Sequence, residues 1–230
     1  MITEILPAGV VVCEAFTDDP ATFLFPEERE VISRAVDKRR REFTTVRHCA
    51  RRALAQLGLP PGPLLPGERG APSWPAGVVG SMTHCDGYRA AVVARRADFT
   101  SVGVDAEPHN PLPEGVLDAI AVPAEQLRHR ALTAAASEIC WDRLLFSAKE
   151  AVYKAWFPLT GMPLDFDEAD ITLRTDGSFT VRIQSRHVPG AHPLPVGYEG
   201  RWRTTTALVA TAIAEPASRT PGAGPSSPPQ

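Results

Sequence analysis

The sequence predicts an α+β fold in two halves of similar order, each with helices packed on antiparallel strands. Three observations support this class. Two long stretches, 26–57 and 141–157, carry apolar residues at helical spacing. Shorter apolar or alternating stretches separated by turn residues are typical of antiparallel strands. Several prolines near residue 110 divide the chain, and the order of helices followed by strands repeats after them.

The first half begins with an apolar stretch, 10–16, that predicts a buried strand. One continuous helix is expected from Pro26 to Leu57, because proline suits a first helical turn and Gly58 follows the last turn. A connector rich in proline and glycine comes next. We then expect three further strands, the last two pairing with each other across a short polar loop: 78–85, 88–94 and 100–107.

The second half starts with two short helical pieces, 112–120 and one from Pro123. The long helix from Trp141 follows, and we expect Pro158 to end it, since proline lacks the N–H that the helix needs. Asp176-Gly177 lies between two alternating segments and therefore predicts a hairpin. The predicted strands of this half are 170–174, 178–183, 201–203 and 207–213.

These elements place a first lobe over 1–108, a second lobe over 109–214 and a tail over 215–230. The tail consists mainly of Pro, Ser, Gly and Thr, so we expect it to be disordered. The formal charge of −3 excludes a global attraction for nucleic acid or acidic membranes. No apolar run approaches the ~20 residues of a membrane helix, and the first residues lack a signal-peptide pattern. Four scattered cysteines suggest reduced thiols and a cytoplasmic protein.

Two acids stand at the end of the predicted strand 100–107. Asp105 and Glu107 are two residues apart, so their side chains project to the same side of the strand. Two hard carboxylate oxygens suit Mg²⁺, which completes its shell with water and substrate phosphate. A pair of exposed acids with no metal is an equally good interpretation of these two residues alone.

The densest charge in the chain lies between Lys38 and Arg52, where seven Lys and Arg face one acid, Glu42. Arg39, Arg47 and Arg51 fall near one helical face, which indicates an anionic ligand. Nonspecific solvation or a nucleic-acid patch remains an alternative.

The helix from Trp141 has an apolar face and a charged rim. Glu150 and Lys154 sit 40° apart on that rim, with Lys149 at its border. An ordinary solvated Glu–Lys pair at i,i+4 is the alternative, worth roughly 0.2–0.5 kcal/mol. Thr83 and His84, at the end of the strand 78–85, offer hydrogen-bond donors to a phosphate, although a lone histidine is more often structural.

The ordered set of motifs is specific: RRREFxxxR, GSMTHC, GVDAE and FSAKEAVYKAW. Together they resemble the signature of the 4′-phosphopantetheinyl transferases. The chain looks most like the monomeric two-lobed type associated with surfactin and enterobactin synthesis, and like the actinobacterial enzymes that act on polyketide and peptide synthetases. The resemblance runs from about Val10 to Ile213. It implies two pseudo-symmetric α+β lobes with coenzyme A as co-substrate in the cleft between them.

The resemblance also implies roles for individual residues. Asp105, Glu107 and Glu150 would form a Mg²⁺ site, with Mn²⁺ possible. Glu150 and Lys154 would be catalytic, Glu150 taking the serine proton directly or through a metal-bound water. The coenzyme A contacts would be Arg39, Arg47, Arg69, Thr83, His84, Lys149 and Lys154. The partners would be apo acyl carrier and peptidyl carrier proteins of polyketide, peptide or fatty-acid synthases, with neither nucleic acid nor a membrane involved.

Three other interpretations fit part of the sequence. A different metal-dependent phosphotransfer enzyme or nuclease would use the same acids but would leave GSMTHC and the arginines unexplained. A silent carrier- or nucleotide-binding module would have no reason to retain the three acids and two lysines. A nucleic-acid binder conflicts with the net charge of −3. Exposed basic residues such as Arg128 and Arg130 are candidate contacts for acidic carrier domains.

Overall fold

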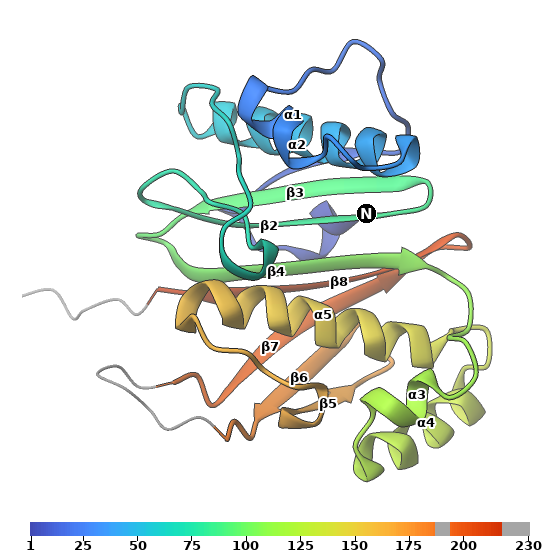
Figure 1. Ribbon diagram of the computed structural model, residues 1–230. Coiled ribbons are helices and arrows are strands. Elements are labelled where there is room, and N and C mark those ends of the chain that lie inside the picture. The colour runs from blue at the N-terminus through green and yellow to red at the C-terminus, as the bar shows by residue number, and fades with distance from the viewer. Residues whose placement is uncertain (187–193, 218–230) are drawn as a thin grey trace, which may run out of the picture.

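The computed structural model describes residues 1–186 and 194–217. Its first lobe is a three-stranded antiparallel sheet, in the order β1-β3-β2, covered by two helices (Figure 1). The elements of this lobe are β1 (Val11–Ala15), α1 (Pro26–Val31), α2 (Asp37–Gln56), β2 (Val78–Cys85) and β3 (Tyr88–Arg95), with short 3₁₀ turns at Ile2–Ile5 and Glu68–Gly70. Small residues of α2, including Ala50 and Ala53, pack on Ala91 and Val93 of β3. Their size brings α2 close to the sheet.

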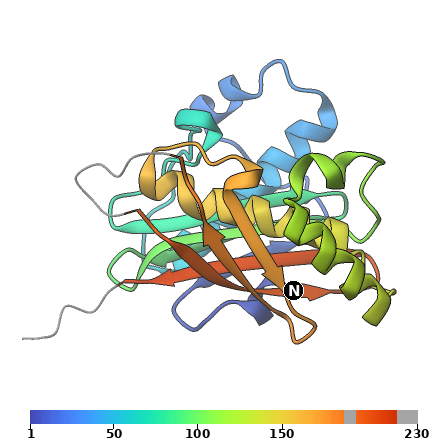
Figure 2. The same cartoon turned by 90° about the horizontal axis from the view of Figure 1, so that it is seen from below.

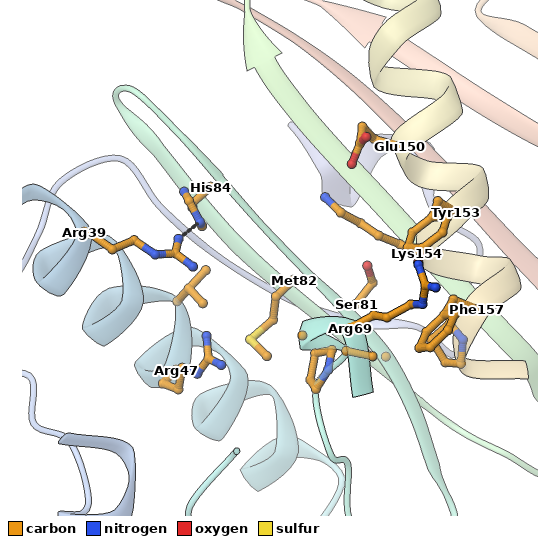
Figure 3. Close-up of a pocket in the computed structure, with 16 residues that line it drawn as sticks. Arg39, Arg47, Arg69, Ser81, Met82, His84, Glu150, Tyr153, Lys154 and Phe157 are labelled. Atoms are coloured by element: carbon orange, nitrogen blue, oxygen red, sulfur yellow. Dashed lines mark hydrogen bonds between the residues drawn. The ribbon is translucent and has the colours of Figure 1, made fainter. Parts of the chain in front are cut away.

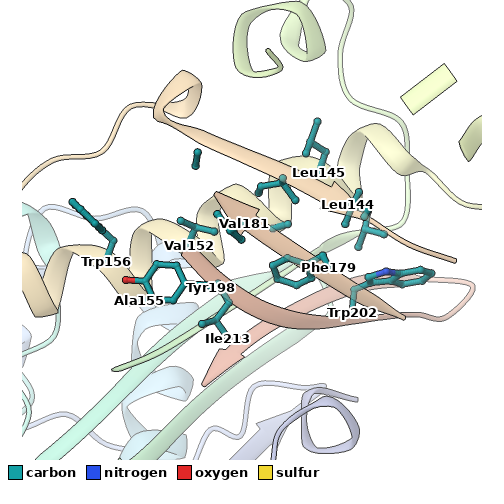
Figure 4. Packing of buried hydrophobic residues seen from close by; sticks show 14 of the residues in the cluster. Leu144, Leu145, Val152, Ala155, Trp156, Phe179, Val181, Tyr198, Trp202 and Ile213 are labelled. Atoms are coloured by element: carbon teal, nitrogen blue, oxygen red, sulfur yellow. The ribbon is translucent and has the colours of Figure 1, made fainter. Parts of the chain in front are cut away.

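The second lobe is a five-stranded antiparallel sheet in the order β4-β8-β7-β6-β5. Its elements are β4 (Phe99–Pro108), α3 (Val116–Ile120), α4 (Pro123–Ala135), α5 (Trp141–Thr160), a 3₁₀ turn at Phe166–Glu168, β5 (Ala169–Leu173), β6 (Ser178–Ile183), β7 (Gly197–Thr204) and β8 (Leu208–Pro216). Figure 2 shows α5 lying across one face of this sheet. Its apolar stripe, Trp141, Leu144, Val152 and Trp156 among others, forms the largest core with strands β5 to β8 (Figure 4).

The two sheets meet between β2 and β4. Their facing strands do not share a backbone ladder; instead, hydroxyl side chains of β2 bind the backbone of β4. Ser81 Oγ accepts the Val104 N–H at 3.1 Å, and Thr83 Oγ1 accepts the Ala106 N–H at 3.1 Å. This joint places the end of β2 beside the acidic end of β4, and α2 and α5 flank it from opposite lobes.

A matched pair of buried glutamates reveals that the lobes repeat one design. In α1, Glu28 accepts the Phe25 N–H at 2.9 Å and holds Arg51 of α2 at 3.0 Å. In α4, Glu125 accepts the Val122 N–H at 2.8 Å and holds Lys149 of α5 at 3.0 Å. Each short helix therefore caps its own start with a carboxylate that also binds a buried cation of the lobe's long helix.

The fold class predicted from the sequence is confirmed, but three local predictions are wrong. The continuous helix 26–57 is two helices, because the chain breaks at 32–36, where Arg40 donates to the carbonyls of Ser33 and Ala35 at 2.5 and 2.8 Å. Pro158 does not end α5: it lies in the last turn, and Gly161, in the left-handed region at φ +67°, ends the helix.

The predicted pairing of 88–94 with 100–107 is the third error. Strand β3 lies between β1 and β2, whereas β4 pairs with β8, Asp105 standing opposite Thr211. The strand 99–108, which the predicted boundary gives to the first lobe, thus belongs to the sheet of the second. Glu215 and Pro216 of the expected disordered tail end β8, and residues 218–230 lie outside the described residues.

Candidate functional site

A cavity of about 280 Å³ opens between the two lobes (Figure 3). Helix α2, the loop around Arg69, strand β2 and helix α5 all contribute to its wall. Its charged and polar lining is mainly basic: Arg39, Arg47, Arg69, His84 and Lys154, together with Ser81 and the carboxylate of Glu150. A cavity with this lining suits an anionic ligand, and guanidinium groups bind phosphate well.

The basic residues are held in place by their neighbours. Arg47 is buried, stacks over the Phe43 ring at 3.6 Å and donates to the Leu64 carbonyl at 3.3 Å. Burial lowers the pKa of Arg47 to about 10, with the charge of Arg39 adding to the shift, so the guanidinium remains charged at neutral pH. Fixed in this way, it presents a positive charge without the cost of ordering a long side chain.

His84 lies between two charged groups of α2. Its Nε2 contacts the Arg39 guanidinium, and its Nδ1 is 3.4 Å from a carboxylate oxygen of Glu42. Burial and the positive charge of Arg39 lower the pKa of His84 to about 4. The ring is therefore neutral at physiological pH, and its position at the cavity wall is set by Arg39 and Glu42 together.

Arg69 occupies an unusual backbone conformation. Its φ of +52° is the sole left-handed value among the non-glycine residues that the structure describes. The Glu68–Gly70 turn closes against Ala71, whose N–H donates to the Glu68 carbonyl at 3.1 Å. Figure 3 shows the side chain of Arg69 reaching toward Phe157.

A second cavity, of about 330 Å³, adjoins the first and is acidic. Asp105, Glu107 and Glu150 all line it, and His84, Glu150 and Lys154 line both cavities. Asp105 is 3% exposed; its Oδ1 accepts hydrogen bonds from Lys154 Nζ at 2.7 Å and Thr83 Oγ1 at 3.1 Å. Its other oxygen, Oδ2, is buried and has no partner within the described residues.

The other two acids differ in their partners. Glu107 Oε2 accepts from Arg143 Nη1 at 3.0 Å, yet burial and the charge of Asp105 raise its pKa. Burial also raises the pKa of Glu150; Lys154 opposes the shift and Asp105 adds to it. Three carboxylates therefore share one cavity with too little positive charge around them, a situation that a hard cation would relieve.

A glycine explains how α5 approaches these acids. A Cβ at Gly103 would lie 2.0 Å from the Ala151 carbonyl oxygen and 2.7 Å from the Ala155 nitrogen, both in α5. Only glycine allows β4 and α5 to touch along their backbones at this point. The contact sets Glu150 and Lys154 over the end of β4, where Asp105 and Glu107 project.

The three carboxylates nevertheless do not form a ready-made metal centre. Within 1–186 and 194–217, no group of three potential ligands is close enough to hold an ion. The residues fit a divalent cation in chemistry, since they supply hard oxygens and a buried, unpartnered Asp105 Oδ2. Lys154 now occupies the other oxygen of the same carboxylate.

Two predicted ligand residues do not line the arginine-rich cavity. Lys149 is buried in the second lobe; its ammonium donates to the Phe166 and Ala169 carbonyls at 2.7 and 2.8 Å and pairs with Glu125. The expected phosphate contact of Lys149 is thus not supported, because its three donors are already used inside the protein. Thr83 lines the acidic cavity rather than the arginine-rich one, and it holds β4 and Asp105.

Sequence reasoning also missed functional neighbours. The sequence motifs assign no role to Arg143, which binds Glu107. They also assign none to Tyr153 and Phe157, whose stacked rings line the arginine-rich cavity. Helical spacing could have predicted the aromatic pair, because Tyr153 and Phe157 lie three and seven residues after Glu150 and so share its face of α5.

No helix in the described part of the chain is long and apolar enough to cross a membrane.

Comparison with known proteins covers both lobes. A family model described as the 4′-phosphopantetheinyl transferase N-terminal domain matches residues 27–94, and one described as the 4′-phosphopantetheinyl transferase superfamily matches residues 101–207. Among curated proteins, 4′-phosphopantetheinyl transferase Svp of Streptomyces mobaraensis is 56% identical over 93% of this chain and 89% of its own length. PptT of Mycobacterium tuberculosis is 51% identical, over 93% of this chain and 97% of the relative. Npt of Nocardia iowensis is 50% identical, over 93% of this chain and 99% of its own length.

Proposed function

The chain belongs to the 4′-phosphopantetheinyl transferase superfamily and is a transferase, and we propose that it moves the 4′-phosphopantetheine group of coenzyme A to a serine of apo carrier proteins. The serine oxygen forms a bond to the β-phosphorus, the pyrophosphate bond breaks, and 3′,5′-adenosine bisphosphate leaves. The proton of the serine hydroxyl goes to a base of the enzyme.

One observation carries this proposal: a basic cavity and an acidic cavity adjoin and share His84, Glu150 and Lys154. Coenzyme A combines a bisphosphorylated nucleotide with a pyrophosphate, and the arginine-rich cavity offers Arg39, Arg47 and Arg69 to such a ligand. Phosphoryl transfer depends mostly on positioning and on charge neutralisation. The arrangement supports an ordered ligand whose reacting phosphates lie near the carboxylates.

We assign the residues of the acidic cavity as follows. Asp105, Glu107 and Glu150 would hold Mg²⁺, or Mn²⁺, which when bound supplies charge stabilisation to the pyrophosphate. Glu150 is the proposed acceptor of the serine proton, directly or through a metal-bound water, since its carboxylate lines both cavities. Lys154 offers its ammonium to phosphate oxygens.

The carrier partner is proposed from charge and exposure. Carrier domains of polyketide, peptide or fatty-acid synthases are the expected substrates, and an acidic surface around their serine would favour basic residues on the enzyme. Arg130 is exposed on α4 and remains a candidate contact. Arg128 is a weaker one than the sequence suggested, because it binds Asp170 and the Ile171 carbonyl. We propose a cytoplasmic monomer.

The test is intact-mass spectrometry of an apo carrier protein incubated with the enzyme, coenzyme A and Mg²⁺. The proposal predicts a metal-dependent gain of one phosphopantetheine group, roughly 340 Da. Calorimetry with coenzyme A alone separates two causes of failure. Binding without transfer to several carriers points to a narrow choice of partner, whereas absence of binding contradicts the proposal.

A further inference from the structure

Two cations lie against the acidic cavity, and they are held differently. Arg143 binds Glu107 at 3.0 Å, and its other nitrogens donate to the carbonyls of Asn110 at 3.0 Å and Pro111 at 3.1 Å. Within the described residues, the Lys154 ammonium donates one hydrogen bond, to Asp105 at 2.7 Å. Arg143 is therefore fixed behind Glu107, whereas the Lys154 ammonium has one bond to break in order to leave.

The partner that Lys154 neutralises is unusual. Asp105 is almost completely buried, and its Oδ2 has no hydrogen-bond donor in the part of the chain that the structure describes. A buried carboxylate without compensation is costly, so Lys154 stabilises the free protein in this arrangement. The same ammonium would repel a dication approaching the same carboxylate.

Lys154 is also placed to bind a different anion. Its side chain lines the arginine-rich cavity together with Arg39 and Arg47, and Figure 3 shows it extending from α5 into the space between the lobes. The four-carbon stem of lysine lets its ammonium move by a few ångströms without any backbone change. A phosphate in the basic cavity is therefore within the range of the side chain that now holds Asp105.

We propose that Lys154 is an exchangeable counter-ion, which occupies Asp105 in the free protein and moves to a phosphate of the ligand, so that a divalent cation and the phosphate ligand bind cooperatively. In the absence of the ligand, Lys154 keeps the metal affinity of the acidic cavity low. When phosphate takes the ammonium, Asp105 is released for the metal. This inference rests on the proposed function, because it needs a phosphate ligand in the basic cavity.

The experiment measures Mn²⁺ binding to the full-length protein by the electron paramagnetic resonance signal of free Mn²⁺. Lys154→Met removes the charge and keeps the length of the side chain, and Lys154→Arg keeps the charge. Lys38→Met is a matched control for loss of one lysine, since Lys38 is exposed and paired with Asp86 at 3.3 Å outside both cavities. Circular dichroism checks that each variant is folded, and Lys154→Gln is a second neutral variant.

Without any nucleotide, Lys154→Met and Lys154→Gln should bind Mn²⁺ about tenfold or more tightly than the unchanged protein, a typical coupling between sites. Lys154→Arg and Lys38→Met should stay within about twofold of it. Adding 3′,5′-adenosine bisphosphate should raise the Mn²⁺ affinity of the unchanged protein and have little effect on Lys154→Met. Asp105→Asn in the Lys154→Met background should abolish the gained affinity, which locates it.

Two results overturn the inference. One is a neutral variant that binds Mn²⁺ no more tightly than the unchanged protein, and the other is the absence of Mn²⁺ binding in every variant. In either case the gain of mass on an apo carrier protein reports separately on the proposed function. Transfer with no effect of residue 154 on metal affinity rejects the counter-ion role alone, while absence of both transfer and coenzyme A binding rejects the proposed function.

Discussion

Lys149→Met should destabilise the fold far more than it weakens coenzyme A binding. The sequence places Lys149 next to Glu150, the proposed base, in a motif whose resemblance implies a phosphate contact. The structure instead buries its ammonium against Glu125, with both side chains 1% exposed. The substitution therefore removes one partner of a buried ion pair that anchors α5 to α4.

The expected loss of unfolding free energy depends on the partners that Glu125 keeps after the substitution. Breaking a buried pair by removing one partner costs about 3–5 kcal/mol. Glu125 would keep two backbone donors, Val122 at 2.8 Å and Ile171 at 2.7 Å, which places the cost near the lower end, about 3 kcal/mol. For a chain of 230 residues, this corresponds to a fall in Tm of about 6–12 °C.

Urea unfolding and calorimetry with coenzyme A, carried out on the same preparation, test this prediction. The double variant Glu125→Gln with Lys149→Met should recover part of the lost free energy, because no uncompensated charge stays buried. Coenzyme A affinity should change by less than about threefold in the folded variant. A variant with unchanged unfolding free energy and a coenzyme A affinity lowered more than tenfold would refute the reasoning and return Lys149 to the ligand site.

Three further outcomes follow from the site. Arg47→Met should weaken coenzyme A binding by about tenfold or more, because a charged hydrogen-bond donor is lost. In the unchanged protein the coenzyme A affinity should stay constant between about pH 7 and 8.5, because the pKa of Arg47 is about 10. Calorimetry measures both. If Glu150 is the base, Glu150→Gln should slow transfer at saturating Mg²⁺, and a variant with the unchanged rate and pH profile would end that role. Gly103→Ala should lower the free energy of unfolding by about 1–3 kcal/mol and slow transfer, because its Cβ would lie 2.0 Å from the Ala151 oxygen. A variant with unchanged unfolding free energy and transfer rate would show that the contact with α5 is not tight.

The spacing of the three acids predicted their common location better than the periodicities predicted the pairing of the strands. Asp105, Glu107 and Glu150 do line one cavity, because two-residue spacing on a strand and a packed helix fix which way each side chain projects. The neighbour of β4 was not predictable in the same way. Most of this strand is buried, so its pattern carries no sign of the edge that pairs with β8.

Charge on a helix was also ambiguous. Arg51 lies on the same face of α2 as Arg47 in the sequence pattern, yet it binds the buried Glu28 rather than the ligand cavity. Lys149 repeats this arrangement in the second lobe with Glu125. Both carboxylates, Glu28 and Glu125, are the third residue of a helix that starts with proline. This repeated spacing in the sequence indicates that each carboxylate binds a cation inside its own lobe.

The most direct measurement of the central claim compares the unchanged protein with Asp105→Asn in the carrier-protein mass assay, with Mg²⁺ and with a chelator. We expect a gain of roughly 340 Da with Mg²⁺, none with the chelator, and a rate about 10²–10³-fold lower for Asp105→Asn at equal folding. Transfer that persists at the full rate in Asp105→Asn, or in the presence of the chelator, would contradict a transfer that depends on a metal bound by Asp105.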